Sequence, residues 1–199
     1  MRDVDAAVAA LAAGELAIVP TDTVYGLASA PAEEPVRRLY RAKGRDEPQP
    51  TALVAAGVDV LLELVPELAG RPEAVARTLL PGAFTLVLPN PERRFPWLTG
   101  GRPETIGVRV PAVTGVARDL LAGARVLVAT SANLPGGPDP RRLDDVPPEL
   151  RAAAAAELDA GELPGTPSTV LDLTGADPVV IREGAVPAAE ALRAVAAVH

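Results

Sequence analysis

The sequence predicts a single α/β domain built on a twisted, open, mixed β-sheet with flanking helices. Strand-like apolar runs alternate with helix-like segments along the chain, which is typical of α/β proteins. Several of the strand-like runs are close neighbours in the sequence, and this favours a sheet with antiparallel pairs over a purely parallel one. The 199 residues suit one compact core, so we expect residues 1–199 to form one domain.

The first part of the chain alternates helical periodicity with short apolar runs. Asp3 is a possible N-cap of the first helix, and acidic residues at the start and basic residues at the end of 33–44 suit a helix dipole. Gly26 is expected to let the chain turn away after the first strand. The elements expected here are a helix at 4–12, a strand at 16–20, a helix at 33–44, a strand at 51–56, helices at 58–68 and 72–80, and a strand at 84–89.

The second part of the chain continues in the same way. Proline and glycine concentrate in residues 89–103 and 135–148, which are expected to be surface loops and candidate mobile lids. The elements expected here are strands at 105–111, 125–131, 168–173 and 178–183, and helices at 113–122, 147–157 and 187–197.

Composition excludes several classes of chemistry. The sequence has no cysteine, and its one histidine is His199, so disulfides, thiolate metal sites, a cysteine nucleophile and a histidine general base are excluded. The net charge of −7 argues against a surface that coats nucleic acid, although it allows a local basic pocket. The apolar runs are too short to cross a membrane, and Asp3 and Asp5 stand where a secretion signal would carry basic residues. We therefore expect a cytoplasmic protein without membrane association.

Short polar sets fall at the ends of predicted strands and helices. Ligands of open α/β sheets bind outside the strand ends, so these side chains are expected to converge there. Each set also has a purely structural interpretation, because hydroxyl groups and carboxylates cap turns and helices, and basic residues complement a helix C-terminus. The sets are Thr21-Asp22-Thr23, Lys43-Gly44-Arg45, Thr130-Ser131-Ala132-Asn133 and Ser168-Thr169.

Two arginines, Arg109 and Arg182, interrupt otherwise apolar strands. Arg109 is flanked by Val108 and Val110, and a guanidinium buried there requires an anionic partner. A pocket that is cationic and rich in hydroxyl groups suits phosphate and carboxylate ligands. The sequence has neither a Walker loop nor a Gly-x-Gly-x-x-Gly motif, so a nucleotide would bind in another kind of site. The cations expected in the pocket are Lys43, Arg45, Arg109, Arg141 and Arg182.

Seven motifs, in this order, resemble those of the YrdC/Sua5 family, the threonylcarbamoyl-AMP synthases. They are "PTDTVYGL", "KGR" with a proline-containing segment after it, "LLPGAFTLVL", "TIGVRVP", "TSAN", "STVLDL" and "VIREG". The similarity extends from about Gly14 to Val186. The chain resembles the short, single-domain branch of the family, which implies one YrdC-like domain.

The resemblance implies a nucleotidyltransferase that forms L-threonylcarbamoyladenylate and pyrophosphate from L-threonine, bicarbonate and ATP, with Mg²⁺ accompanying the ATP. The reaction is the first step of the t6A modification of tRNA, and a separate threonylcarbamoyl transferase complex then moves the group to tRNA. By similarity, threonine would be held by Thr23, Thr105, Arg109 and Ser131. ATP would be surrounded by Lys43, Arg45, Asn133, Arg141, Ser168 and Arg182, with Lys43 and Arg45 also acting in catalysis and Arg142 as the alternative to Arg141.

Two positions depart from the family pattern. Thr51-Ala52 follow a proline where a leucine is usual, which puts substrate contacts near Gln49 and Val54 in doubt. Pro135 follows "SANL" where Ser-Gly is common, and it removes an amide donor and stiffens that loop. We expect the activity to survive both changes.

Two other functions are compatible with these residues. One is an RNA-binding module, for which the acidic net charge predicts at most weak tRNA binding. The other is a related enzyme that keeps the nucleotide pocket but acts on a different carbamoyl substrate.

Overall fold

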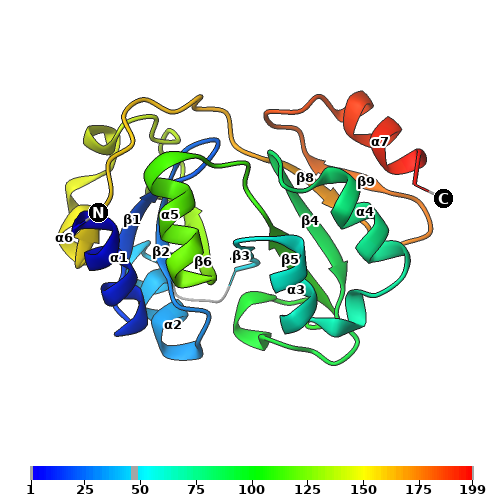
Figure 1. The fold of residues 1–199 in the computed structure, drawn as a ribbon, viewed down its shortest axis with the longest axis horizontal. Helices are drawn as coiled ribbons and strands as arrows, with labels where there is room; N and C mark the ends of the chain where they lie inside the picture. Colours follow the sequence, from blue (N-terminus) through cyan, green and yellow to red (C-terminus); the bar gives the residue numbers. More distant parts are fainter. Residues whose placement is uncertain (1, 46–48, 199) are drawn as a thin grey trace.

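The computed structural model describes residues 2–45 and 49–198, and one sheet runs through them (Figure 1). Its strands are β1 (Ala17–Pro20), β2 (Tyr25–Ser29), β3 (Ala52–Ala55), β4 (Phe84–Pro89), β5 (Thr105–Arg109), β6 (Val126–Ser131), β7 (Ala156–Glu157), β8 (Thr169–Asp172) and β9 (Val179–Arg182). The strand order is β7-β1-β2-β6-β3-β5-β4-β8-β9. The pairs β1–β7, β3–β5 and β4–β8 are parallel and the other pairs are antiparallel. The twisted, open, mixed sheet is confirmed, and the extent of the domain over 1–199 stays a prediction.

Helices flank the sheet on both faces. They are α1 (Arg2–Ala12), α2 (Glu33–Ala42), α3 (Val58–Leu64), α4 (Arg71–Leu79), α5 (Gly115–Ala124), α6 (Pro148–Ala153) and α7 (Ala188–Ala196), with 3₁₀ turns η1 (Pro66–Leu68), η2 (Pro96–Leu98) and η3 (Leu143–Asp145). The helix expected over 58–68 is divided into α3 and η1, because Pro66 lacks the amide hydrogen that would continue it.

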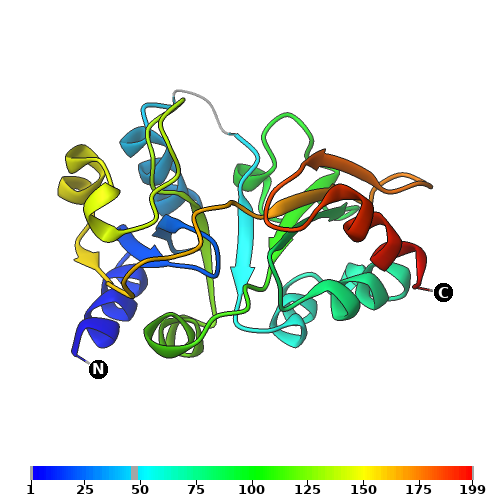
Figure 2. The same ribbon diagram turned by 90° about the horizontal axis from the view of Figure 1, so that it is seen from above.

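The helices lie in separate groups along the sheet. At the end of the sheet that contains β7 and β1, α1 packs on α5, while α2 packs on β2 and α6 (Figure 2). At the other end, α4 packs on α3 and α7. None of the helices in the described ranges is long and apolar enough to cross a bilayer, and the expected cytoplasmic location stays a prediction.

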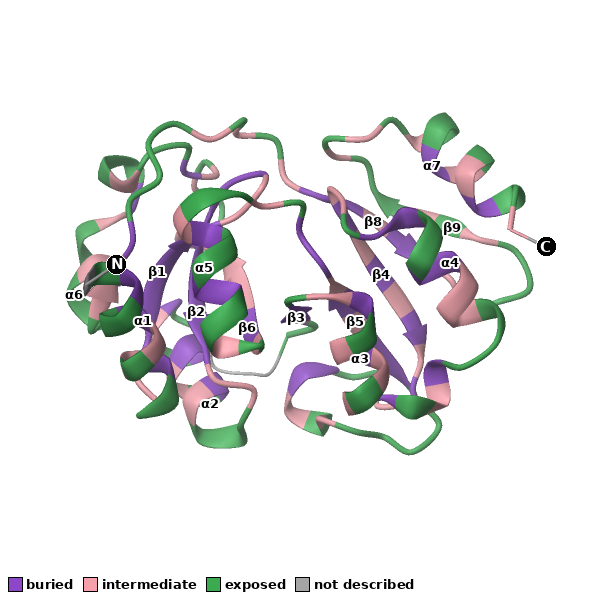
Figure 3. Ribbon diagram, in the orientation of Figure 1, coloured by how far each residue is buried: buried purple, intermediate pink, exposed green. Residues whose placement is uncertain are grey.

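Strand alternation divides the side chains between two buried clusters. Figure 3 shows buried residues along the strands and exposed residues on the outer faces of the helices. On β1, Ala17 and Val19 pack with α1 and α5, whereas Ile18 points to the opposite face and joins the larger core. On β5, Ile106 and Val108 are fully buried in that larger core. The side chains between them point to the other face of the sheet, because successive residues of a strand alternate.

Strand β2 was not expected, and the turn assigned to Gly26 is wrong. Gly26 lies inside β2, where it pairs with Val19 on one side and Ser131 on the other. A Cβ at Gly26 would lie 3.3 Å from the carbonyl oxygen of Thr130. Glycine at this position is therefore explained by the close approach of β6.

The turn that joins β1 to β2 is made by residues 21–24. The hydroxyl of Thr21 donates to the carbonyl of Val24 at 2.7 Å, and it accepts hydrogen bonds from the amides of Thr23 and Val24 at 3.2 Å. A threonine side chain that bonds to nearby backbone in this way stabilises a turn. The side chains of the "TDT" sequence are thus held in fixed directions.

The helix expected over 147–157 is also wrong in its second half. It ends as α6, and β7 follows and pairs in parallel with β1. The amide of Ala155 donates to Leu16 O at 2.8 Å, and the amide of Leu158 donates to Ile18 O at 2.9 Å. The alanine-rich sequence has high helix propensity, but pairing at the sheet edge decides its conformation.

The two segments expected as loops, 89–103 and 135–148, contain only short 3₁₀ turns apart from Pro89, which ends β4, and Pro148, which begins α6. Asn90 is buried, and its Nδ2 donates to Arg94 O at 2.9 Å and to Pro103 O at 3.1 Å. These bonds tie the first loop together at its base. The role of the two loops as mobile lids stays a prediction.

Candidate active site

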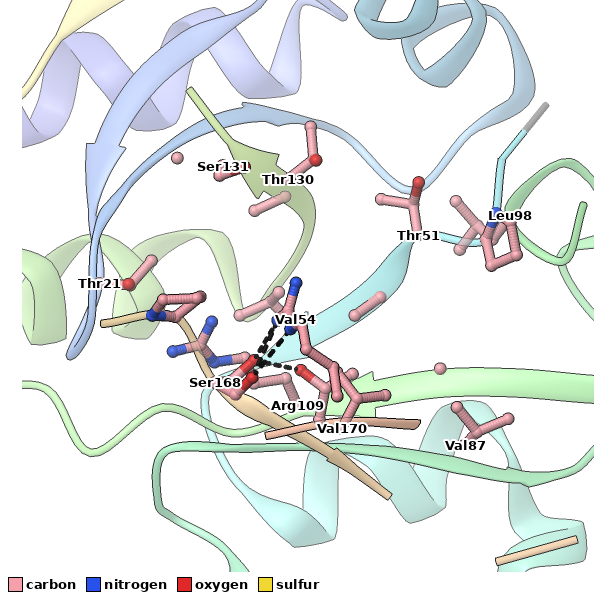
Figure 4. Close-up of a pocket in the computed structure, with 18 of the residues that line it drawn as sticks. Thr21, Thr51, Val54, Val87, Leu98, Arg109, Thr130, Ser131, Ser168 and Val170 are labelled. Atoms are coloured by element: carbon pink, nitrogen blue, oxygen red, sulfur yellow. Dashed lines mark hydrogen bonds between the residues drawn. The ribbon is translucent and has the colours of Figure 1, made fainter. Parts of the chain in front are cut away.

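A cavity of about 230 Å³ lies against the sheet. Its walls come from the turn before β2, from β3, β4, β5 and β6, and from the chain around β8 and β9 (Figure 4). Several residues predicted to bind substrates line this cavity together: Thr23, Thr105, Arg109, Ser131, Ser168 and Arg182. The expected convergence at the strand ends is therefore observed for these side chains, and their roles toward ligands stay predictions.

Strand alternation places the polar side chains in the cavity. On β5, Thr105, Gly107 and Arg109 line the cavity, while Ile106 and Val108 point into the core. The same alternation on β4 and β8 sends alternate residues to the cavity. The pattern that builds the core thus also builds the row of polar residues.

Arg109 is held by Asp22, a residue that the sequence indicated only as part of a polar set or a turn. Its Nη2 donates to the carboxylate of Asp22 and to Thr23 Oγ1 at 2.8 Å. The other oxygen of Asp22 accepts the amide of Ala112 at 2.9 Å. Burial lowers the pKa of Arg109 and Asp22 opposes this effect, and arginine keeps its proton in proteins. The protein itself therefore supplies an anionic partner for this buried guanidinium.

Lys43 lies outside the cavity lining and reaches it through Ser131. Its Nζ donates to Ser131 O at 2.5 Å and to Asn133 Oδ1 at 3.2 Å. The side chain is only 1% exposed. Burial and repulsion from Arg45 lower the pKa of Lys43 to about 8, and Asp139 partly opposes this. A buried ammonium of this kind is typical of a site that receives an anion.

The side chain of Asn133 forms hydrogen bonds with Ser131, Lys43 and Gly137. Its Oδ1 accepts hydrogen bonds from Ser131 Oγ at 2.7 Å and from Lys43, and its Nδ2 donates to Gly137 O at 2.7 Å. Asn133 is not part of the cavity lining. Its predicted contact with ATP stays a prediction, and its observed position links Ser131 and Lys43 to the turn that contains Pro135.

Ser168 and Arg182 form the opposite wall of the cavity. The Nη2 of Arg182 donates to Ser168 O at 2.9 Å, and Ser168 Oγ lies 2.8 Å from Thr85 Oγ1. Thr85 was missed by sequence reasoning, although its place between the core residues of "FTL" could have revealed it. Among the residues with described structure, no carboxylate forms an ion pair with Arg182. This wall therefore carries net positive charge.

Arg141 and Arg45 are not in the cavity lining. Arg141 pairs with one oxygen of Glu162 at 2.8 Å, and Arg142 pairs with the other at 2.5 Å. Since both arginines share one carboxylate at the surface, their positions favour neither as the ATP ligand. Burial lowers the pKa of Arg45. The proline-containing segment after "KGR" includes residues 46–48, which lie outside the described residues, as does His199.

The first departure from the family pattern contributes to the cavity wall. Thr51, Ala52 and Val54 line the cavity, whereas Gln49 does not. The hydroxyl of Tyr40 donates to Gln49 O at 2.8 Å and to Thr51 Oγ1 at 3.1 Å. Thr51 therefore connects α2, which precedes Lys43, with the start of β3.

The cavity offers few ligands for a resident metal ion. No cluster of three or more histidine, cysteine, aspartate or glutamate residues occurs in the described part of the chain. The side-chain oxygens that line the cavity belong to threonine and serine. Mg²⁺ prefers carboxylates and phosphate oxygens, so the residues present fit a magnesium ion carried by a nucleotide better than one held by the protein.

Known proteins share this sequence pattern and this fold. The family model Sua5_yciO_yrdC, described as "Telomere recombination", matches residues 9–184. A threonylcarbamoyl-AMP synthase of Pyrococcus abyssi is 37% identical over 179 residues, which cover 89% of this chain and 52% of that protein. A putative threonylcarbamoyl-AMP synthase of Mycobacterium tuberculosis is 34% identical over 187 residues, which cover 93% of this chain and 85% of that protein.

A solved structure of P. abyssi Sua5 complexed with L-threonine superimposes with a TM-score of 0.83 at 32% identity. The match covers 98% of this chain and 58% of that chain. The chain thus spans about half the length of the P. abyssi protein.

Proposed function

Because the chain belongs to the Sua5/YciO/YrdC family, we propose that it is a threonylcarbamoyl-AMP synthase. It would join L-threonine, bicarbonate and ATP into L-threonylcarbamoyladenylate and release pyrophosphate. The observation that carries this proposal is the single cavity in which Arg109, Arg182 and a row of hydroxyl groups converge. Such a cavity suits a carboxylate and a phosphate chain bound side by side.

The amino acid is proposed to bind at the Arg109 end. A guanidinium suits the substrate carboxylate, and the hydroxyls of Thr23, Thr105 and Ser131 can orient its polar groups. A related protein with the same fold was solved with L-threonine, which supports an amino-acid substrate here.

The nucleotide is proposed to bind along Ser168 and Arg182, with Lys43 behind Ser131. These cations would neutralise phosphate charge, and the resemblance adds Arg45, Asn133 and Arg141 to the same group. Mg²⁺ would enter bound to the phosphates of ATP. Lys43 is suited to this role because it is buried without an ion-pair partner among the described residues.

The proposed chemistry needs alignment and charge neutralisation. The amine of threonine attacks the carbon of bicarbonate, and loss of water leaves a carbamate. A carbamate oxygen then attacks the α-phosphorus of ATP, the bond from that phosphorus to the bridging oxygen breaks, and pyrophosphate leaves. The nucleophile of the second step is already an anion, so cations that stabilise the phosphates are the main requirement.

Pyrophosphate release tests the proposed function. We expect release from ATP only when threonine and bicarbonate are both present, because the carbamate forms before the α-phosphate is attacked. Mixtures that lack one component provide the controls. Release that does not depend on threonine would contradict the proposal and favour another carbamoyl substrate. An RNA-binding module would release no pyrophosphate under any of these conditions.

ATP affinity is expected to fall as pH rises above 8, because Lys43 has a pKa of about 8 in the free protein. A phosphate partner raises that pKa, so binding takes up a proton at higher pH. Calorimetry should show Kd weakening about tenfold between about pH 7 and pH 9. In Lys43→Gln this pH dependence should disappear. An unchanged Kd over this range in the unmodified protein would show that Lys43 does not meet the phosphates.

Transfer of the product to tRNA is proposed to require a separate threonylcarbamoyl transferase complex. Direct tRNA binding is proposed to be weak, since the net charge of −7 opposes contact with a polyanion.

A further inference from the structure

The side chain of Asp22 contacts Arg109, is largely shielded from solvent and does not line the cavity. It is 9% exposed and that of Arg109 is 12% exposed. One carboxylate oxygen accepts from Arg109 and the other from the amide of Ala112. Asp22 therefore connects the turn between β1 and β2 to both the last residue of β5 and the chain that follows it.

The support for Asp22 is rigid. The hydroxyl of Thr21 closes the turn with three hydrogen bonds to the backbone of Thr23 and Val24. After Asp22, the carbonyl of Thr23 accepts the amide of Gly165 at 2.8 Å, and the amide of Tyr25 donates to Pro140 O at 3.0 Å. Because the turn is tied to two other segments, Asp22 holds Arg109 against a fixed part of the structure.

These contacts determine which part of Arg109 can meet a ligand. Nη2 is already bound to Asp22 and Thr23, and Nε is buried without a partner among the described residues. The remaining terminal nitrogen, Nη1, is then the donor that Arg109 can present to the cavity. Without the carboxylate, Thr23 would be the one side-chain partner left to fix the guanidinium within the described structure.

Asp22 also sets the charge at this end of the cavity. Arg109 and Arg182 both line the cavity, and their charges repel each other. With Asp22, Arg109 forms a pair that is neutral overall, whereas Arg182 has no carboxylate partner in the described ranges. A neutral pair suits a zwitterionic amino acid, and the uncompensated Arg182 suits a phosphate.

We propose that Asp22 is a positioning residue that aims Arg109 at the carboxylate of the amino-acid substrate and keeps this end of the cavity neutral. The proposal rests on the proposed function, and it adds a residue that acts through Arg109 without touching the substrate. Loss of the Asp22 charge should therefore affect threonine far more than ATP.

The test is the substitution Asp22→Asn, which keeps the shape of the side chain and an acceptor for the Ala112 amide. In steady-state assays of pyrophosphate release, we expect KM for threonine to rise at least about tenfold, while kcat and KM for ATP change less than about threefold. Melting temperature should confirm that the variant is folded.

Asp172→Asn is the matched control. Asp172 accepts from Arg102 Nη1 at 2.9 Å and from the amide of Thr174 at 2.9 Å, so it is another aspartate between an arginine and a backbone amide. Neither Asp172 nor Arg102 lines the cavity. The control is expected to keep the KM values of the unmodified protein.

The possible outcomes distinguish a failure of the positioning role of Asp22 from a failure of the proposed function. An active unmodified protein whose Asp22→Asn variant keeps its threonine KM would overturn the positioning role and leave the function intact. A parallel rise of both KM values with a lowered melting temperature would mark Asp22 as structural and also overturn it. An unmodified protein without threonine-dependent release would defeat both proposals.

A second substitution covers the case in which Asp22→Asn does not fold. Asp22→Glu keeps the charge but displaces it by one methylene group, so Arg109 should be misdirected. We expect the same selective rise in threonine KM, by at least about fivefold. A threonine KM within about twofold of the unmodified value would contradict positioning.

Discussion

Arg109→Ala is expected to lower kcat/KM for threonine about a thousandfold or more, because the guanidinium is the group best placed to bind the substrate carboxylate. The substitution should also destabilise the fold by about 3–5 kcal/mol. The reason is that Asp22, buried with Arg109, would be left as a charge without its cationic partner. Pyrophosphate-release kinetics and urea unfolding measure the two effects separately.

The double variant Asp22→Ala/Arg109→Ala separates activity from stability. It removes both charges, so we expect it to recover a large part of the lost free energy of unfolding and none of the lost activity. Normal turnover by the single Arg109→Ala variant would contradict the role of Arg109. Loss of stability without a change in the threonine affinity of the folded fraction would assign Arg109 a structural role alone.

Lys43→Arg is expected to reduce kcat/KM for ATP by about a hundredfold or more. The space between Ser131 O and Asn133 Oδ1 holds a compact ammonium that is 1% exposed. A planar guanidinium is larger and directs its donors differently, so it cannot replace that group. The assay is pyrophosphate release at varied ATP concentration, with a melting curve to show that the variant is folded.

The reverse substitution Arg41→Lys provides the control. Arg41 lies on α2, which precedes Lys43, and its side chain is exposed and pairs with Glu34 at 2.6 Å. Exposed ion pairs contribute little to stability, so the control should keep normal kinetics. If Lys43→Arg is as active as the control, the proposed contact between Lys43 and the phosphates is wrong.

The parts of the fold that could be predicted are those whose apolar pattern is strong. The strands β4 and β5 have core residues at alternate positions, which made them visible in the sequence. β2 contains glycine and alanine and follows a polar turn, and β7 has two residues at the sheet edge. Their conformation depends on pairing with β1, which no local pattern records.

The candidate site also contains residues whose positions could be predicted and residues whose positions could not. The positions of Ser131 and Ser168 followed from their places at strand ends, because strand order and alternation bring such residues together, whereas Thr105 was expected only from the family resemblance. The role of Asp22 could not be predicted, since 87 positions separate it from Arg109 and an aspartate after a strand is equally common in turns.

Residues on loops were the least predictable part of the site. Arg141 was expected near ATP, but its observed partner is Glu162, which lies on a segment without regular structure. Flexible arginine side chains at a surface pair with whichever carboxylate is near, and that neighbour depends on how the whole chain folds. Lys43 was expected in the pocket. In the structure it does not line the cavity, and its link to the site is the pair of hydrogen bonds from its ammonium to Ser131 O and Asn133 Oδ1.

The most direct measurement is a crystal structure of the protein soaked with L-threonine and then with ATP. We expect the threonine carboxylate within hydrogen-bond distance of Arg109, and the triphosphate along Ser168 and Arg182 in the same cavity. Either ligand bound elsewhere, or threonine expelled from the cavity by ATP, would contradict a shared site for the two substrates.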